Sequence, residues 1–295
     1  MELQWPLIVF TTLVAWSAGL FGTQALMAAF GVGKKAQVPA WIASAVLLAV
    51  GGIAVFFHLE HWERIFNGFG HLTSGITQEL IAIVVLAAVA VAYLVMLRKS
   101  DDGASVPKWL AWLSVALVAV MAHSYTMAAR PAWDSVLWIL YVLGNACVLG
   151  PATFAFLMAA APPAGQPAGR AADAGAPAGL AALVGAAANA LAALAFAIFL
   201  QLSAGSFADV GYYFDPTHPT EAMADAAATV GAQAPLLWLG AVAVGAIVPL
   251  AAAFMGRRSG NWRLWAPVAI IAALAGAVCM RVAFYNLGLS VFMFY

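Results

Sequence analysis

Eight long apolar runs constrain this chain more than any other feature of its sequence. They span about residues 6–30, 39–58, 75–97, 108–128, 135–159, 179–203, 232–255 and 264–291. A helix needs about 20 predominantly apolar residues to cross the hydrocarbon core of a bilayer. Backbone polar groups cannot stay unpaired in lipid, and the runs lack the alternation of barrel strands. We therefore predict an all-α integral membrane protein, a single transmembrane domain over residues 1–295 built as a bundle of eight helices.

Composition agrees with this fold class. Hydrophobic residues make up 65% of the 295 positions, more than a soluble domain of this size can cover, and charged residues only 8%. The charges balance at 12 basic against 12 acidic, which gives no electrostatic basis for binding nucleic acid. Cys147 and Cys279 both lie inside apolar runs and are expected to be small buried side chains. Two cysteines are too few for an iron–sulfur cluster.

The ends of several runs carry helix-start signals. The first run has no basic residue ahead of it and is too long for a signal peptide, so we predict a helix. Pro6, Pro39 and Pro107 stand at or just before expected helix starts, where a missing N–H costs little.

The basic residues predict the orientation of the bundle. Two of the twelve, Arg64 and Arg130, fall on one side of the membrane, and Arg281 falls inside the last run. The other nine follow the first, third, fifth and seventh runs: Lys34, Lys35, Arg98, Lys99, Lys108, Arg170, Arg257, Arg258 and Arg263. Because basic loops stay in the cytoplasm, we predict a multi-pass protein of the cytoplasmic (inner) membrane with both termini on the outer, extracytoplasmic side.

Two connections differ in composition from the rest. Residues 160–178 are rich in Pro, Ala and Gly and predict a flexible cytoplasmic linker. Residues 204–231 form an outer-face loop with four acids, no Lys or Arg, and the aromatic cluster Tyr212, Tyr213 and Phe214. This loop is either a solvated connection or a docking surface or lid, because exposed aromatic side chains often anchor interfaces.

Four ionisable residues are predicted to lie within or at the ends of spans: His58, Glu79, His123 and Arg281. Charged groups in a bilayer cost about 2.5 kcal/mol or more, so those that persist commonly serve a site. Since alternate helices run in opposite directions, all four fall in the outer half of the membrane. Arg281 is expected about 15 Å below its helix end. This convergence is the main functional signal in the sequence.

Each of these residues also has a purely structural interpretation. Glu79 could be an acid favoured by a helix N-terminus, and His58 an interfacial residue with a wet tip. Arg281 could serve only to neutralise Glu79, although Tyr285, four residues on, would then point to the same place. His123 is most simply a packed residue at a helix end.

The stretch from His58 to Glu79 concentrates three of the five histidines and three of the twelve acids. A metal site could be formed by His58, His61, His71, Glu60 and Glu63, but a single His-x-x-His spacing is weak support. A haem b would need two axial histidines, for which His58 and His123 are the candidate pair.

The segment with His58-Leu59, Arg64, Phe66-Asn67, Ser74 and Glu79 between two membrane helices resembles the membrane anchor subunit of dimethyl sulfoxide reductase. This is the DmsC type, related to the NrfD-like quinol-oxidising anchors. The expected eight helices, the outer termini and the closing Arg281-Val-Ala-Phe-Tyr-Asn-Leu-Gly stretch are similar to the same family.

The resemblance implies a specific function. Such anchors carry no haem, bind menaquinol near the outer face, and pass its electrons to an iron–sulfur subunit docked there. That subunit supplies a molybdopterin catalytic subunit in anaerobic respiration, which reduces the terminal acceptor. In the family, the residues matching His58 and Glu79 are implicated in quinol binding and oxidation.

The chemistry of the residues agrees with this expectation. Quinol oxidation releases two protons, which His58 and Glu79 are expected to accept. Arg281 is expected to orient the carboxylate, Tyr285 or Asn286 to bind a ring oxygen, and Arg64 and His123 to complete the quinol pocket. The alternatives are a haem b-containing anchor and a secondary transporter, although the matched broken helices typical of transporters are not evident.

Overall fold

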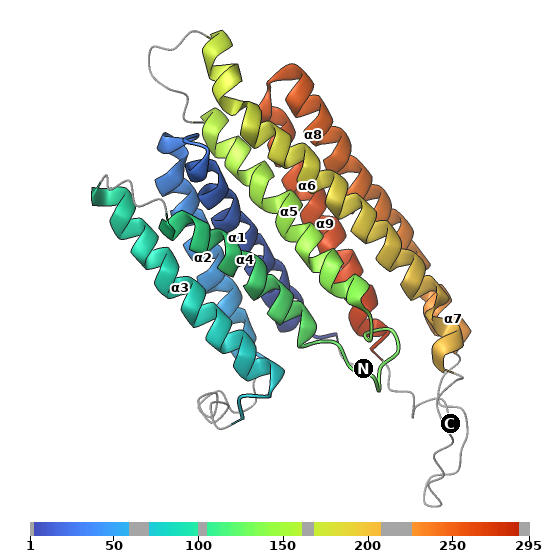
Figure 1. Ribbon diagram of the computed structural model, residues 1–295. Helices are drawn as coiled ribbons and strands as arrows, with labels where there is room; N and C mark the ends of the chain where they lie inside the picture. Colours follow the sequence, from blue (N-terminus) through green and yellow to red (C-terminus); the bar gives the residue numbers. More distant parts are fainter. Residues whose placement is uncertain (1–2, 59–70, 100–104, 161–167, 208–225, 289–295) are drawn as a thin grey trace, which may run out of the picture.

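The computed structural model describes residues 3–58, 71–99, 105–160, 168–207 and 226–288. Across these ranges the chain is helical, and eight of its helices are long and apolar enough to cross a membrane. The predicted all-α, eight-span membrane fold is therefore confirmed. The helices run side by side, with the start of α1 and the end of α9 at the same end of the bundle (Figure 1): α1 Trp5–Ala29, α2 Lys34–Phe56, α3 Gly75–Lys99, α4 Ser105–His123, α5 Val136–Ala160, α6 Ala168–Leu202, α7 Ala226–Ala232, α8 Val248–Ser259 and α9 Trp262–Asn286.

Helices α1, α5 and α9 form the centre of the bundle. Helix α1 packs against α2, α4 and α5, while α9 packs against α5, α8 and the stretch Leu236–Ile247 of the seventh span. Helices α2 and α3 lie at the periphery, and both expose apolar side chains along most of their length (Figure 1). In a membrane these exposed Val and Ile side chains face lipid, so their exposure carries no penalty.

Several helix ends differ from the sequence prediction. Helix α2 begins at Lys34, five residues before Pro39, which lies inside the helix. A proline near a helix start removes a hydrogen bond only from an exposed end, where water replaces it. Helix α6 begins at Ala168 rather than at 179, so residues 168–178, part of the predicted linker, are helical. Alanine, the strongest helix former, dominates this stretch.

Helix α4 is shorter at its end than predicted, finishing at His123 rather than at 128. The hydroxyls of Ser124 and Thr126 lie 2.8 and 2.7 Å from the carbonyl oxygens of Met121 and His123. They satisfy carbonyls that the next helical turn would otherwise have bonded, so the chain can turn away there. Helix α9 likewise ends at Asn286 rather than at 291.

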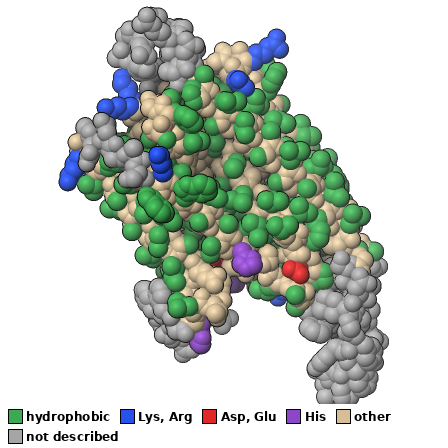
Figure 2. All heavy atoms as spheres, viewed as in Figure 1, with side chains coloured by type: hydrophobic (Ala, Val, Ile, Leu, Met, Phe, Trp, Pro, Cys, Tyr) green, Lys and Arg blue, Asp and Glu red, His purple; other side chains and the backbone are tan. Residues whose placement is uncertain are grey.

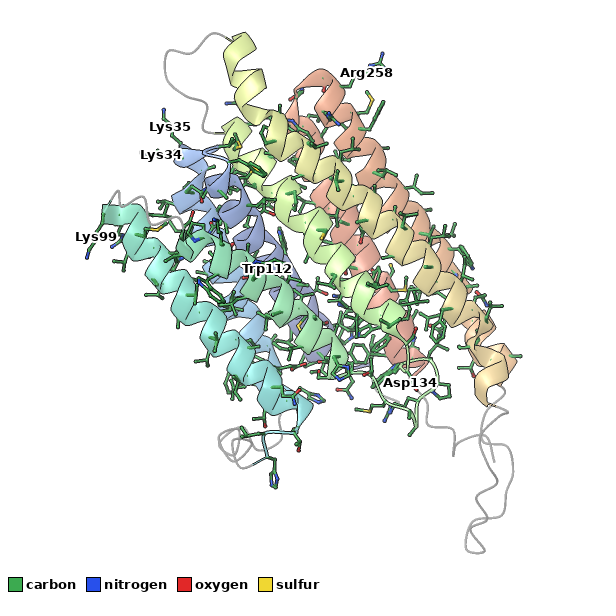
Figure 3. All side chains as sticks on the ribbon, viewed as in Figure 1. Lys34, Lys35, Lys99, Trp112, Asp134 and Arg258 are labelled. Atoms are coloured by element: carbon green, nitrogen blue, oxygen red, sulfur yellow. The ribbon has the colours of Figure 1, made fainter. Side chains whose placement is uncertain are left out.

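Charged side chains separate to the two ends of the bundle. We call one end the basic end, because it carries all the described Lys and Arg side chains except Arg130 and the internal Arg281 (Figures 2 and 3): Lys34, Lys35, Arg98, Lys99, Lys108, Arg257, Arg258 and Arg263. The two acidic residues whose side chains are described, Glu79 and Asp134, lie at the opposite end, here called the Glu79 end. The apolar belt between them is the membrane-spanning part.

The central helices touch through glycine. A Cβ on Gly150 of α5 would lie 2.2 Å from the carbonyl oxygen of Gly19 on α1, closer than any side chain could come. Small residues at such crossings let membrane helices approach closely enough to gain dispersion energy, because burial of apolar surface gives no driving force in lipid. Gly19 and Gly150 therefore fix the crossing of α1 and α5.

The seventh span contains a π-helical stretch, Leu236–Ile247, between α7 and α8. Gly240 and Gly245 are five residues apart, and both face α9: their added Cβ atoms would lie 2.6 Å from Cys279 Cβ and 2.4 Å from Gly276 Cα. Five residues make about one turn of a π-helix, with its i to i+5 hydrogen bonds, but not of an α-helix. The π-helical register thus places both glycines against the same neighbour.

Candidate functional site

Glu79 is a buried carboxyl in the second turn of α3, only 7% exposed. The Ser124 hydroxyl, just past the end of α4, donates a hydrogen bond to its Oε1. Gly75, one turn before Glu79 on the same face, makes this contact sterically possible, because a Cβ there would lie 2.7 Å from Ser124 Cβ. The Oε2 atom of Glu79 has no hydrogen-bond partner among the described residues.

Two tyrosines stand next to this carboxyl. The rings of Tyr125 and Tyr285 meet edge to face with centroids 6.2 Å apart. Burial, and then the neighbouring Tyr285 and Glu79, raise the pKa of Tyr125 well above its usual value, while Arg281 acts in the opposite direction. Tyr285 is 3% exposed, and its hydroxyl lies near that of Tyr125, but no described residue gives it a hydrogen bond of good geometry. An unpaired buried hydroxyl is costly, so it is suited to hold a ligand atom.

An aromatic stack fixes the end of α9 beside these tyrosines. The rings of Trp133 and Phe284 stack at 4.7 Å, and Phe284 stacks in turn on Trp138 at 3.9 Å. The Trp133 indole donates to the backbone oxygen of Phe284 over 2.6 Å. Arg130 lies 4.6 Å above the Trp133 ring and donates to the carbonyl oxygen of Gly288. These contacts hold the α4–α5 connection rigidly over Tyr285.

Arg281 is fully buried, but it does not neutralise Glu79. Its Nε donates to Thr11 Oγ1 at 2.9 Å and its Nη1 to Asn145 Oδ1 at 2.7 Å, with further bonds to the carbonyls of Ala277 and Thr11. No ion pair joins Arg281 to an acid in the part of the chain that the structure describes. The expected role of Arg281 in orienting the Glu79 carboxylate is therefore wrong, and Ser124 makes that contact. The earlier end of α9 also places Arg281 only about 7.5 Å from its helix end.

A chain of amides continues from Arg281 into the bundle. Asn145 Nδ2 donates to Asn189 Oδ1 at 2.9 Å, and Asn189 Nδ2 donates to the carbonyl oxygen of Gly245 at 3.0 Å. In an α-helix the N–H of residue 249 would bond that carbonyl, but residue 249 is a proline without an N–H. The amide of Asn189 supplies the missing donor and links α6 to the seventh span.

The histidines predicted for the site lie at the Glu79 end, but on its surface. Helix α2 ends at Phe56, and the His58 side chain beyond it is exposed. His123 is also exposed, with its Nδ1 3.2 Å from the Thr126 hydroxyl. Among the described residues no hydrogen bond joins His58 to Glu79. Arg64 lies outside the described residues, as do the aromatic cluster 212–214 and most of the 204–231 loop.

The exposed positions of these histidines give no geometric support to the alternative metal and haem sites. Axial haem ligands face each other across helices in the interior, whereas His58 and His123 are both exposed. Of the histidine and acid cluster considered for a metal, only His58 and His71 are described, and the described residues contain no group of three such ligands. Asn286, expected to bind a ring oxygen, donates instead to Gln233 Oε1 at 3.0 Å.

Sequence reasoning missed Ser124, Tyr125 and the amide pair Asn145 and Asn189. Ser124 and Tyr125 were placed inside the predicted helix 108–128, so their position at a turn was not evident. Asn145 and Asn189 did carry a signal, because an amide within an apolar run must find a partner. A search for all polar residues in the spans, not only the ionisable ones, would have found them.

The site therefore combines a buried carboxyl, a buried phenol and an exposed histidine at the same end of the bundle. Among the described residues, Glu79 Oε2 and the Tyr285 hydroxyl have no hydrogen-bond partner. Such a set can bind a small molecule with two hydroxyl groups and accept protons from it. Neither the protein-family models nor the curated proteins compared with this chain gave a match.

Proposed function

We propose that this protein is the membrane anchor and quinol-oxidising subunit of a molybdenum oxidoreductase complex of the dimethyl sulfoxide reductase type. Menaquinol would bind at the Glu79 end, which we place on the outer side of the cytoplasmic membrane. An iron–sulfur subunit docked on that face would receive the electrons and pass them to a molybdopterin catalytic subunit. The proposal rests on the sequence resemblance and on buried Glu79 beside Tyr285, since Glu79 Oε2 and the Tyr285 hydroxyl have no hydrogen-bond partner among the described residues.

The proposed reaction converts menaquinol to menaquinone, two electrons and two protons. Glu79 Oε2 accepts a hydrogen bond from one quinol hydroxyl and then its proton, while Ser124 keeps Oε1 in place. The Tyr285 hydroxyl donates a hydrogen bond to the ring oxygen as it becomes a carbonyl. His58, at the exposed end of α2, takes up the second proton and releases it to water. Both electrons leave to the iron–sulfur partner.

The position of the site determines whether the reaction moves charge across the membrane. Both protons are released at the end of the bundle where the quinol is oxidised and the electrons depart. The half-reaction therefore moves no net charge across the membrane. Arg281 lies below the site, bonded to neutral acceptors, and raises the barrier to a proton that would move inward.

The test is to replace Glu79 and His58 singly by Gln in the assembled complex and to measure oxidation of a menaquinol analogue. General acid–base groups contribute roughly 10²–10⁴-fold, so we expect each variant to lose at least tenfold in turnover. The matched controls are His71→Gln and Gln78→Ala, which change exposed residues at the same end of the bundle. Native turnover in Glu79→Gln, with the complex intact, would refute the proposed role of the carboxyl.

A further inference from the structure

An apolar crevice lies away from the Glu79 site, between α1, α4, α5 and α6. Its volume is about 350 Å³, within the range of small-molecule sites. Its walls are mostly small residues: Gly19, Gly22, Ala111, Ala146, Gly185 and Ala188. Because these lining side chains are small, they leave a channel between the four helices that is wide enough for an acyl chain. Larger side chains would have filled it.

The crevice opens sideways into the lipid phase. Leu26, Val115 and Val184 line it and are 43%, 51% and 59% exposed. The hydroxyls in its wall are already satisfied, since Thr23 and Ser114 donate to the carbonyls of Gly19 and Leu110, each at 2.7 Å. A crevice without free polar groups does not hold ordered water. Its occupant is therefore a hydrocarbon chain.

The basic end adds a charge above the crevice. Lys108 on α4 is exposed and precedes the lining residues Ala111 and Val115 by three and seven positions, so it lies on the same helix face. The crevice wall on α4 runs from residue 111 to 118, roughly 10 Å, which is within the length of one leaflet. The flexible stem of a lysine lets its ammonium reach the headgroup level above the chain.

Aromatic residues mark the same level of the membrane. Trp109 and Trp112 directly follow Lys108 and Ala111 on α4 and are 64% and 72% exposed. Tryptophan favours the boundary between headgroups and acyl chains. The basic end carries eight of the described Lys and Arg side chains, so its field attracts a headgroup with net negative charge rather than a zwitterion.

We propose that this crevice binds one anionic glycerophospholipid from the leaflet at the basic end. One acyl chain would lie between α4 and α6 against the glycines of α1, and the phosphate would pair with Lys108. The site is independent of the quinol chemistry proposed for the Glu79 end. It would fill the crevice between α4 and α6 beside the α1–α5 contact, so the lipid would stabilise the packing of these four helices.

The experiment uses the full-length protein in detergent, titrated with phosphatidylglycerol or phosphatidylcholine and followed by native mass spectrometry. We expect one tightly retained phosphatidylglycerol and no comparable phosphatidylcholine. Lys108→Gln should weaken retention about fivefold, equivalent to the ~1 kcal/mol of one basic residue near a lipid surface. Lys99→Gln, at the same end on α3, is the matched charge control and should bind normally.

A second pair of variants tests the crevice itself. Ala111→Phe should block the acyl chain and abolish retention, whereas Ala49→Phe places the same ring on an exposed position of α2 and should not. Equal retention of both lipids, equal effects of the two lysine variants, or retention of a menaquinone in place of phospholipid would overturn the proposal. If Ala111→Phe does not fold, the two lysine variants still decide.

Discussion

Arg281 and Asn145 lie 2.7 Å apart, Nη1 to Oδ1, in the interior of the bundle. This bond, together with those to Thr11 and Ala277, gives a buried cation four neutral acceptor contacts and no carboxylate partner among the described residues. The guanidinium also lies 5.7 Å from the centre of the Trp138 ring, where the aromatic face attracts a cation. Helices α1, α5 and α9 are thus tied together by one side chain.

Removing the Asn145 acceptor should therefore destabilise the protein strongly. In Asn145→Leu, Arg281 Nη1 loses its shortest bond and Asn189 Oδ1 loses its donor. We expect a loss on the order of 3 kcal/mol, the upper part of the range for unpaired buried groups. Thermal unfolding in detergent measures it. Asn145→Asp keeps an acceptor for Arg281 and should lose less; equal stability of the leucine variant and the native protein would contradict the prediction.

Tyr285 provides a test that separates binding from stability. Its hydroxyl has no partner among the described residues, so Tyr285→Phe should keep the native unfolding temperature or raise it slightly. If the hydroxyl binds the quinone oxygen, the same variant should weaken binding of a menaquinol analogue by roughly 5- to 10-fold, the effect of about one hydrogen bond.

Trp238→Phe is the matched control for that experiment. Its indole, in the seventh span, donates to Gln201 Oε1 of α6 and makes no described hydrogen bond to Glu79, Ser124 or Tyr285, so the variant should leave analogue binding unchanged. Unchanged affinity in Tyr285→Phe would remove this residue from the proposed pocket.

Replacing glycine by alanine is expected to have opposite effects on stability at Gly185 and at Gly52. A Cβ on Gly185 would lie 1.7 Å from the carbonyl oxygen of Cys147, so α5 and α6 meet backbone to backbone at this point. Pro151, four residues after Cys147, has no N–H to bond that carbonyl. Gly185→Ala must therefore separate α5 from α6. A Cβ on Gly52 in α2 meets nothing within 4 Å, so Gly52→Ala should stabilise by about 0.5–1 kcal/mol through helix propensity.

Unfolding curves of both glycine variants under one condition give the comparison. We expect Gly185→Ala to lower the midpoint and Gly52→Ala to hold or raise it. A native midpoint for Gly185→Ala would show that α5 and α6 do not cross as closely as described here.

The orientation in the membrane can be checked with single cysteines. After replacing Cys147 and Cys279 by Ser, Ser259→Cys reports on the basic end and Met127→Cys on the Glu79 end, both at exposed positions. A thiol reagent that cannot cross membranes should label Met127→Cys in intact cells and Ser259→Cys only after lysis, since basic ends remain in the cytoplasm. The reverse pattern would place the quinol site on the wrong side for the proposed partner.

The apolar runs were sufficient to predict the number of spans and the place of Glu79 and Tyr285 at one end of the bundle. They could not predict the partners of Arg281, because neutral acceptors such as Thr11 and Asn145 are distant in sequence and carry no charge pattern. Residues 124–128 continue an apolar run, so hydropathy extended α4 past the point where the Ser124 and Thr126 hydroxyls end it. Hydropathy senses solvent preference, whereas these features depend on individual hydrogen bonds.

The spacing of Gly240 and Gly245 has a consequence for chain length in the seventh span. Loss of one residue between them would leave a spacing of four, about the repeat of an ordinary α-helix, with both glycines still turned to α9. The π-helical stretch of this span is thus equivalent to an α-helix with one inserted residue. A one-residue deletion among positions 241–244 should be accommodated here. Loss of one residue between Cys147 and Gly150 of α5 would instead rotate the face that meets Gly185 by about 100° relative to the face that meets Gly19.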